Sequence, residues 1–242
     1  MFLFIRLVLG HLFGDFPLQF NRVYELKHKG IKGGIPHAIL IVCSLLLLSW
    51  PYLNIAQVWY FVFAVGILHL FQDSIKISYG SIKFSFWMYL IDQIIHIATI
   101  SALFLTNLKY LGPLTNKGCP LLALYNNNAI VIYVCFLILA TYNGFYLMRT
   151  FRTTFFGKSG LHNAVENWYG IAERAGIVTL CLRGGYFFLL LPVIFFLRFV
   201  VFYAGKDKFA LNEQFISASE LTLTWMIGGI SGAGLYFLLP LL

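Results

Sequence analysis

Long apolar segments alternate with short polar ones along the whole chain. Eight of these segments approach the ~20 residues that a transmembrane helix needs, and Gly, Pro, Asn or charged residues separate them. They cover residues 1–20, 36–53, 55–76, 84–106, 128–148, 164–182, 185–204 and 216–241. Runs such as 39–48 are apolar on every side and lack the alternation of a barrel strand. The pattern predicts an all-α fold, a polytopic transmembrane helical bundle of about eight spans, or seven if the segments around Gly184 and Gly185 form one broken helix.

The predicted bundle divides at a long polar stretch. Residues 1–106 hold the first four helices, residues 107–127 form an external loop rich in Gly, Pro and Asn, and residues 128–242 hold the C-terminal helices. Charged and polar residues interrupt the first apolar run, whereas the apolar region of a signal peptide is continuous. We therefore expect a helix of the mature protein there. The expected organisation is one membrane domain in two halves.

Composition excludes a soluble domain. Of the 242 residues, 60% are apolar and only 11% are charged, whereas about a quarter of a soluble domain is charged. The 17 Lys and Arg residues outnumber the 9 Asp and Glu residues and give a net charge of +8. Most of these cations lie in short loops between apolar runs, where they set membrane orientation. We therefore expect no nucleic-acid partner.

The loop cations predict how the bundle is oriented. Eleven of them lie on one side of the predicted helices: Arg22, Lys27, Lys29, Lys32, Lys76, Lys83, Arg149, Arg152, Lys158, Lys206 and Lys208. The opposite loops contribute only Lys109 and Lys117. Because short loops rich in Lys and Arg stay in the cytoplasm, both termini are predicted to lie outside it.

Ionisable residues inside the apolar segments follow a common spacing. Three pairs are each four residues apart: His11 with Asp15, His69 with Asp73, and Asp92 with His96. On a helix, each pair occupies one face. The order reverses in the third pair, whose helix runs in the opposite direction, so all three helices can present a carboxylate on the cytoplasmic side and an imidazole one turn deeper. Asp92 lies about eight residues into its predicted helix, so the layers align only if that helix is shifted.

Further polar residues can join these layers. They are His37, after Pro36 at the start of the second helix, and Gln19, Gln72, Gln93 and Lys76. His and Asp from separate helices are ligands typical of Zn, Fe or Mn and leave room for an activated water. The pattern thus predicts a divalent metal site. The alternatives are hydrogen bonds between helices, a proton or ion path, or haem held by two of His37, His69 and His96.

A second group of ionisable residues lies in the C-terminal half. It contains Glu173 and Arg174 in the sixth predicted helix, Arg198 in the seventh and Glu220 early in the eighth. Intramembrane Glu and Arg residues usually pair, so bridges between helices are one interpretation. The other is substrate binding by Glu173, Arg174 and Arg198, with the guanidinium groups on a lipid phosphate.

The order of these motifs resembles a bacterial membrane-protein family, domain of unknown function 3307, over most of the chain. The resemblance rests on His11, Asp15, Phe16 and Gln19; Lys27; His37; His69, Asp73 and Lys76; Asp92, Gln93 and His96; Gly170, Glu173 and Arg174; and Arg198 with Phe199. Two departures fall in the C-terminal half, where Ile194 and Phe195 replace an expected Lys–Ser pair and Glu220 fits only with a shifted register. The resemblance implies a bacterial cytoplasmic (inner) membrane protein and supports the site, but it implies no activity.

Together these features favour a metal-dependent intramembrane enzyme, a hydrolase or transferase that acts on a lipid or lipid-linked substrate at the cytoplasmic leaflet. The ligands of one or two ions are expected among His11, Asp15, His69, Asp73, Asp92 and His96. We expect His37 or a free carboxylate such as Asp92 as general base, Lys76 on an anionic head group, and Gln19 and Gln93 as further substrate contacts.

A cation- or proton-coupled transporter is the main alternative function. Inverted-repeat transporters carry matching motifs in both halves, whereas all three His–Asp pairs of this chain precede residue 97. A haem-binding membrane protein is a weaker alternative.

Overall fold

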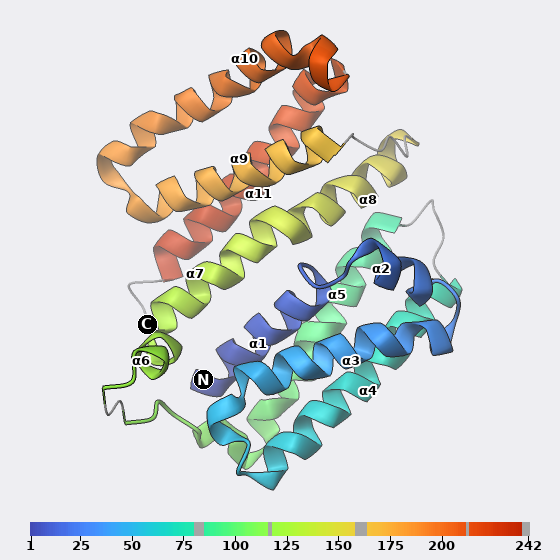
Figure 1. The fold of residues 1–242 in the computed structure, drawn as a ribbon, viewed down its shortest axis with the longest axis vertical. Coiled ribbons are helices and arrows are strands. Elements are labelled where there is room, and N and C mark those ends of the chain that lie inside the picture. The colour runs from blue at the N-terminus through green and yellow to red at the C-terminus, as the bar shows by residue number, and fades with distance from the viewer. Residues whose placement is uncertain (80–84, 116–117, 158–163, 212, 239–242) are drawn as a thin grey trace. The chain divides into compact units, whose positions relative to one another are not determined.

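A computed structural model gives the fold of residues 1–79, 85–115, 118–157, 164–211 and 213–238 (Figure 1). Within these ranges all regular secondary structure is helical, as the apolar pattern predicts. The chain forms two compact units, Met1–Cys135 and Phe136–Leu242.

In the described part of the first unit, four long helices form a bundle. They are α1 (Phe2–Asp15), α3 (Ile31–Leu48), α4 (Ala56–Tyr79) and α5 (Ser85–Ser101). α1 packs on α3 and α5, and α4 packs on the same two helices. The short helix α2 (Asn21–Lys27) lies against α3. Single 3-10 turns cover Trp50–Tyr52, Ala102–Leu105 and Asn107–Tyr110, and α6 (Pro120–Asn126) precedes α7 (Asn128–Ile138), which begins in this unit. The stretch predicted as an external loop therefore contains helical turns.

Small residues on α1 allow its close approach to α3. A Cβ atom on Gly10 would lie 3.0 Å from the carbonyl oxygen of Ser44, and one on Gly14 would lie 3.1 Å from the Cα atom of Ile41. Glycines four residues apart form the small-xxx-small pattern of membrane helix interfaces. This contact fixes the position of α1, and with it the side chains of His11 and Asp15.

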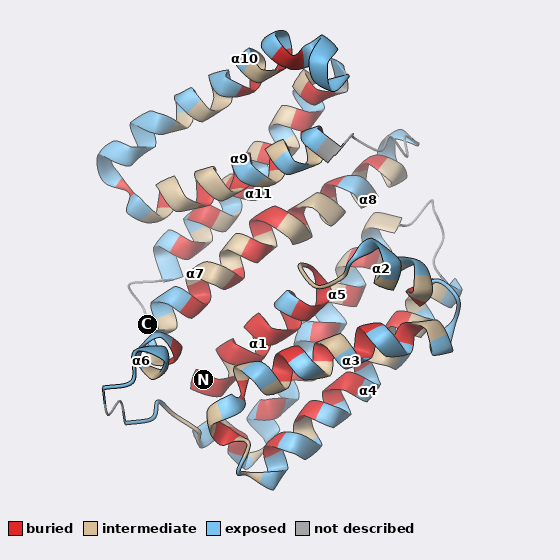
Figure 2. Cartoon of the chain, in the orientation of Figure 1, coloured by how far each residue is buried: buried red, intermediate tan, exposed pale blue. Residues whose placement is uncertain are grey.

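The faces of these helices differ in burial (Figure 2). Leu7, Ile41 and Val62 are almost fully buried in the core, whereas Ile67 and Ile94 on α4 and α5 are more than half exposed. Extended exposed apolar surface is unusual on a soluble protein. On a membrane helix this surface contacts lipid.

Arg6 is a cation within an apolar helix, and the structure gives its partners. Its guanidinium donates to the carbonyl oxygen of Tyr125 at 2.5 Å and to Oδ1 of Asn128 at 2.7 Å. The ring of Phe2 lies 3.3 Å from the guanidinium carbon. Arg6 thereby ties α1 to α6 and to the start of α7, away from the pair His11 and Asp15 near the other end of α1.

The described part of the second unit contains the helices α8 to α11. A π-helical turn (Leu139–Asn143) leads into α8 (Gly144–Phe156), which is followed by α9 (Ala164–Arg183), α10 (Leu191–Phe209) and α11 (Ala218–Leu238), with 3-10 turns at Gly185–Leu190 and Glu213–Ile216. α9 and α11 pack closely, because a Cβ atom on Gly228 would lie 3.1 Å from Cγ2 of Ile177. Gly184 and Gly185 have φ of 63° and 53°, a conformation that favours glycine. They separate α9 from α10, so the segments flanking them are two helices.

Among the described residues, six helical segments are long and apolar enough to cross a membrane, which indicates a multi-pass membrane protein. They are Ile31–Leu48, Ala56–Tyr79, Ser85–Leu105, Asn128–Phe156, Gly185–Phe209 and Ala218–Leu238. The predicted count of seven or eight spans is not confirmed. The first predicted span contains a helix of only 14 residues, about 21 Å long, which Pro17 follows closely. The sixth becomes α9, whose hydropathy is lowered by Glu166, Glu173, Arg174 and Arg183.

Candidate metal centre

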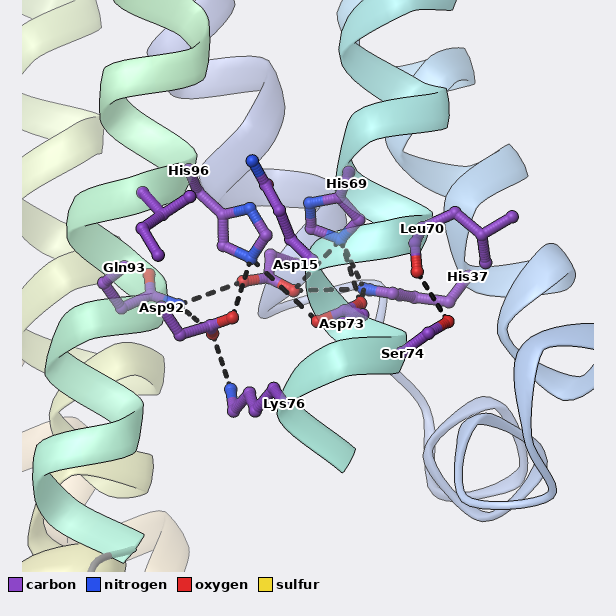
Figure 3. A network of polar contacts seen from close by, with 12 residues as sticks. Asp15, His37, His69, Leu70, Asp73, Ser74, Lys76, Asp92, Gln93 and His96 are labelled. Atoms are coloured by element: carbon purple, nitrogen blue, oxygen red, sulfur yellow. Dashed lines mark hydrogen bonds and ion pairs between the residues drawn. The ribbon is translucent and has the colours of Figure 1, made fainter. Parts of the chain in front are cut away.

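The three His–Asp pairs converge in the first unit. Figure 3 shows Asp15, His69, Asp73, Asp92 and His96 of these pairs, together with His37. The ring centroids of His11, His69 and His96 form a triangle with sides of 5.3, 5.1 and 4.3 Å. All three side chains are at most 2% exposed. α1, α4 and α5 each contribute one imidazole, so the structure brings together the layer that the spacing predicts.

The carboxylates of the same helices form a neighbouring layer. Asp73 lies six residues before Tyr79 at the end of α4, and Asp92 lies seven residues after Ser85 at the start of α5. α4 extends three residues beyond its predicted end at residue 76. The two carboxylates therefore have similar depths in antiparallel helices, which removes the offset expected at Asp92.

Four ligand-type atoms from α1, α3 and α4 lie close together. His37 Nε2 lies 3.0 Å from Asp15 Oδ1, 3.1 Å from His69 Nε2 and 3.5 Å from Asp73 Oδ2. His69 Nε2 lies 3.2 Å from Asp73 Oδ2 and 3.9 Å from Asp15 Oδ1. Four ligands held ~2.0–2.2 Å from one ion in a tetrahedron stand about 3.3–3.6 Å apart. The observed separations bracket this value.

A second group of donors lies on the α5 side of the cluster. His96 Nε2 lies 3.3 Å from Asp92 Oδ1 and 3.9 Å from Asp73 Oδ1. The side chains of Asp73, Asp92 and His96 each offer one ligand atom, and these atoms lie within 4.8 Å of one another. His11, His69 and His96 form another such set, as do Asp15, His37 and His69.

His11 provides a test of whether a metal fits. Its side chain is 1% exposed, and neither ring nitrogen has a hydrogen-bond partner among the described residues. Buried polar atoms are almost always paired, and an unpaired one is costly. A divalent cation would accept the lone pair of one nitrogen, and the neighbouring His and Asp groups are the ligands that Zn, Fe and Mn use. The residues present therefore fit a metal ion.

Two lysines flank the carboxylates. Lys76 Nζ lies 2.5 Å from Asp92 Oδ2 and is part-exposed, with 29% of its side chain accessible. Lys27 Nζ lies 2.6 Å from Asp73 Oδ2 and is buried. Burial alone lowers the pKa of Lys27, but the negative charges of Asp73 and Asp15 raise it above the ordinary value for lysine. The ammonium group of Lys27 thus stays a charged partner of the site at neutral pH.

The two predicted glutamines have different positions. Gln93 donates from Nε2 to Asp92 Oδ2 at 3.3 Å and reaches Asp15 Oδ2 at 3.5 Å. Gln19 lies past the end of α1, is half-buried, and bonds through its backbone to Phe16. The structure therefore brings Gln93 into the cluster, whereas it places Gln19 in the turn between α1 and α2.

The ion pair between Lys27 and Asp73 does not follow from the spacing of the motifs. The orientation argument treats Lys27 as a loop cation. It lies at the last position of α2, the short helix between α1 and α3. Only the family resemblance marks it. No periodicity within seven residues shows which way the helix faces, so the partner of Lys27 is visible only in three dimensions.

Glu173, Arg174 and Arg198 belong to the second unit. Arg198 Nη2 lies 2.5 Å from Glu173 Oε2, and Arg174 donates to the carbonyl oxygens of Ala140 at 2.7 Å and Thr141 at 3.2 Å. These contacts match the interpretation as bridges between helices. Binding of a lipid phosphate by these three residues stays a prediction.

Glu220 has a partner that the sequence did not suggest. It forms an ion pair with Arg152 of α8, which the orientation argument also counts as a loop cation. α8 continues to Phe156, beyond the predicted end of its span at residue 148, and this extension brings Arg152 into the helical bundle.

Comparison with known proteins identifies the N-terminal part. Residues 3–116 match the family described as "Protein of unknown function (DUF3307)", so this segment is a domain of that family, as its His and Asp motifs predict. The match contains all seven His and Asp residues of the cluster, while the C-terminal motifs around Arg174 and Arg198 lie outside it. No curated protein and no solved structure matches the chain.

Proposed function

We propose that this DUF3307-domain protein is a metal-dependent intramembrane enzyme, a hydrolase or transferase that acts on a lipid or lipid-linked substrate. The observation that supports it most is the convergence of four imidazoles and three carboxylates, with both ring nitrogens of a fully buried His11 lacking a hydrogen-bond partner among the described residues. A purely structural network would pair these nitrogens, because each unpaired buried group costs ~1–3 kcal/mol.

The ligands would come from His11, Asp15, His69, Asp73, Asp92 and His96, with His37 beside them. A bound divalent ion supplies Lewis acidity and lowers the pKa of a water toward ~7. His37, held 3.0 Å from Asp15 Oδ1, and Asp92 are the candidate proton acceptors.

Substrate access fits the Lys76 side of the cluster. Lys76 is more exposed than the His and Asp residues, all of which are at most 5% exposed. Its ammonium group next to Asp92 can shift to the anionic head group of an entering lipid, and Gln93 can donate to the same group. The buried ligands orient the reacting group, while Lys76 and Gln93 hold the head group.

The geometry disfavours haem. Two imidazoles on opposite sides of one ion stand ~4 Å apart across it, with the macrocycle between them. Here the Nε2 atoms of His37 and His69 are 3.1 Å apart, and the rings of His69 and His96 stack at 4.3 Å. The imidazoles contact one another directly.

Elemental analysis of the detergent-purified protein, together with an absorption spectrum, tests the proposal. We expect stoichiometric Zn, Fe or Mn and no haem absorption band. A preparation without metal that also fails to take up these ions after dialysis would contradict the enzyme and favour a transporter or scaffold. A haem band would assign the third function instead.

A further inference from the structure

We propose that the cluster binds two divalent ions and that the carboxylate of Asp73 bridges them, an inference that rests on the metal-dependent function proposed above. Oδ2 of Asp73 faces His37 and His69 at 3.5 and 3.2 Å. Its Oδ1 faces His96 at 3.9 Å and has no hydrogen-bond partner among the described residues. The two oxygens of one carboxylate thus point toward two different groups of ligand atoms.

The first ion site consists of Asp15 Oδ1, His37 Nε2, His69 Nε2 and Asp73 Oδ2. Five of the six distances between these atoms are between 3.0 and 3.9 Å. They bracket the edges of a tetrahedral site, about 3.3–3.6 Å. Three helices supply this set, α1, α3 and α4.

The second ion site lies on the α5 side of Asp73. Asp73, Asp92 and His96 each offer one ligand atom within 4.8 Å of the others. His11 adds a fourth donor beside His96, since their rings are 5.1 Å apart and both nitrogens of His11 lack a hydrogen-bond partner among the described residues. An ion here would give a partner to one nitrogen of His11, to His96 Nε2 and to Asp73 Oδ1, which lack a hydrogen-bond partner among the described residues.

The number of donors also favours two ions. Four imidazoles and three carboxylates supply seven side chains, more than the ~4–6 positions around one Zn, Fe or Mn ion. A single ion at the first site would leave His11, Asp92 and His96 without a metal. With Asp73 shared, each of the two ions has four protein donors.

Charge balance predicts what such a pair of ions would bind. The lysines at Asp73 and Asp92 already neutralise two of the three carboxylates. Two divalent ions make the cluster strongly cationic, so it favours an anionic group that can lie across both ions, as in other two-metal sites. Because His37 becomes a ligand in this arrangement, Asp92 Oδ2, on the Lys76 side, remains as the proton acceptor.

Metal stoichiometry and magnetic coupling test this inference on the full chain. We expect two ions per chain in the parent protein and in His28→Ala, whose imidazole is exposed in the α2–α3 connection, and about one in His37→Ala and in His96→Ala. After loading with Mn²⁺, two ions bridged by a carboxylate couple magnetically. The parent should therefore lack the electron paramagnetic resonance signal of isolated Mn²⁺, and each single variant should show it.

The possible outcomes separate the two proposals. One ion per parent chain that is lost from both variants overturns the two-ion inference but leaves the metal-dependent function. Two ions with an uncoupled spectrum overturn the bridging role of Asp73. No ion in the parent removes both proposals. The count and the spectrum of the parent do not depend on whether any variant folds.

Discussion

His69 is shared by two of the three ligand sets, one with His11 and His96 and one with Asp15 and His37. His69→Ala removes a donor that these neighbours cannot replace, so at least one bound ion should be lost. Loss of groups that only support a ligand already costs ~10–100-fold in affinity or activity. If the cluster only joins helices by hydrogen bonds, each worth ~0.6 kcal/mol on average, the same change should barely move the melting temperature.

Metal content and thermal stability of His69→Ala, measured beside His28→Ala, distinguish these cases. His28 is exposed and contacts the ring of Tyr24, so its replacement should leave the metal content unchanged. Equal metal content in both variants would contradict ligation by His69.

Replacing Lys27 should destabilise the protein by an amount that depends on bound metal. Its ammonium pairs with buried Asp73, and removing one partner of a buried pair costs ~3–5 kcal/mol because a charge stays unpaired. A cation at Asp73 would supply the missing positive charge. Lys27→Met should therefore lower the unfolding midpoint much more after chelation than in the metal-loaded protein.

Unfolding of the detergent-solubilised protein with and without chelator measures this difference. Lys29→Met, at an exposed position two residues further on, is the matched control and should have little effect in either state. An equal loss of stability in both states would mean that no cation shares Asp73 with Lys27.

Helix periodicity explains how much of the cluster could be predicted. His and Asp residues four apart must share a face, so their convergence follows once those faces are turned inward. Periodicity does not fix where a helix ends, which is why α1 is shorter and α4 longer than predicted. Periodicity also does not show contacts made by a short helix, such as that of Lys27, or by the extended end of a helix, such as that of Arg152. The sequence therefore predicts both residues as loop cations.

The layers of imidazoles and carboxylates depend on the direction in which each helix runs. α1 and α4 reach the cluster at their C-terminal ends, and α3 reaches it near its N-terminal end. If the loop cations are cytoplasmic, as the sequence predicts, a cysteine at Glu25 in α2 should be labelled only from the cytoplasm and one at Asn127 only from outside.

Impermeant thiol reagents applied to oriented vesicles check this topology. Both positions are exposed, and the exposed native cysteines Cys43 and Cys119 are first replaced by serine. Labelling of both new cysteines from the same side would contradict the predicted orientation.

At the scale of the whole molecule, all candidate ligands belong to the first unit, Met1–Cys135, while the pair Arg198–Glu173 belongs to the second. Both side chains of this pair are at most 1% exposed. Arg198→Met leaves the carboxylate of Glu173 buried with one fewer charged partner, at a cost of ~3–5 kcal/mol. The metal content per folded chain should stay at the parent value, because no ligand is changed.

The double variant Arg198→Met with Glu173→Leu separates a structural pair from a phosphate site. Replacing both members of a buried ion pair by apolar residues is often neutral or stabilising, so a structural pair predicts recovery of the melting temperature. A lipid-phosphate site predicts instead that both variants lose binding to vesicles containing an anionic phospholipid while the melting temperature of Arg198→Met stays unchanged. The guanidinium of Arg198 also donates to the carbonyl oxygen of Phe215 at 3.2 Å. Because this carbonyl and Glu173 already contact both Nη atoms of Arg198, we expect the first result.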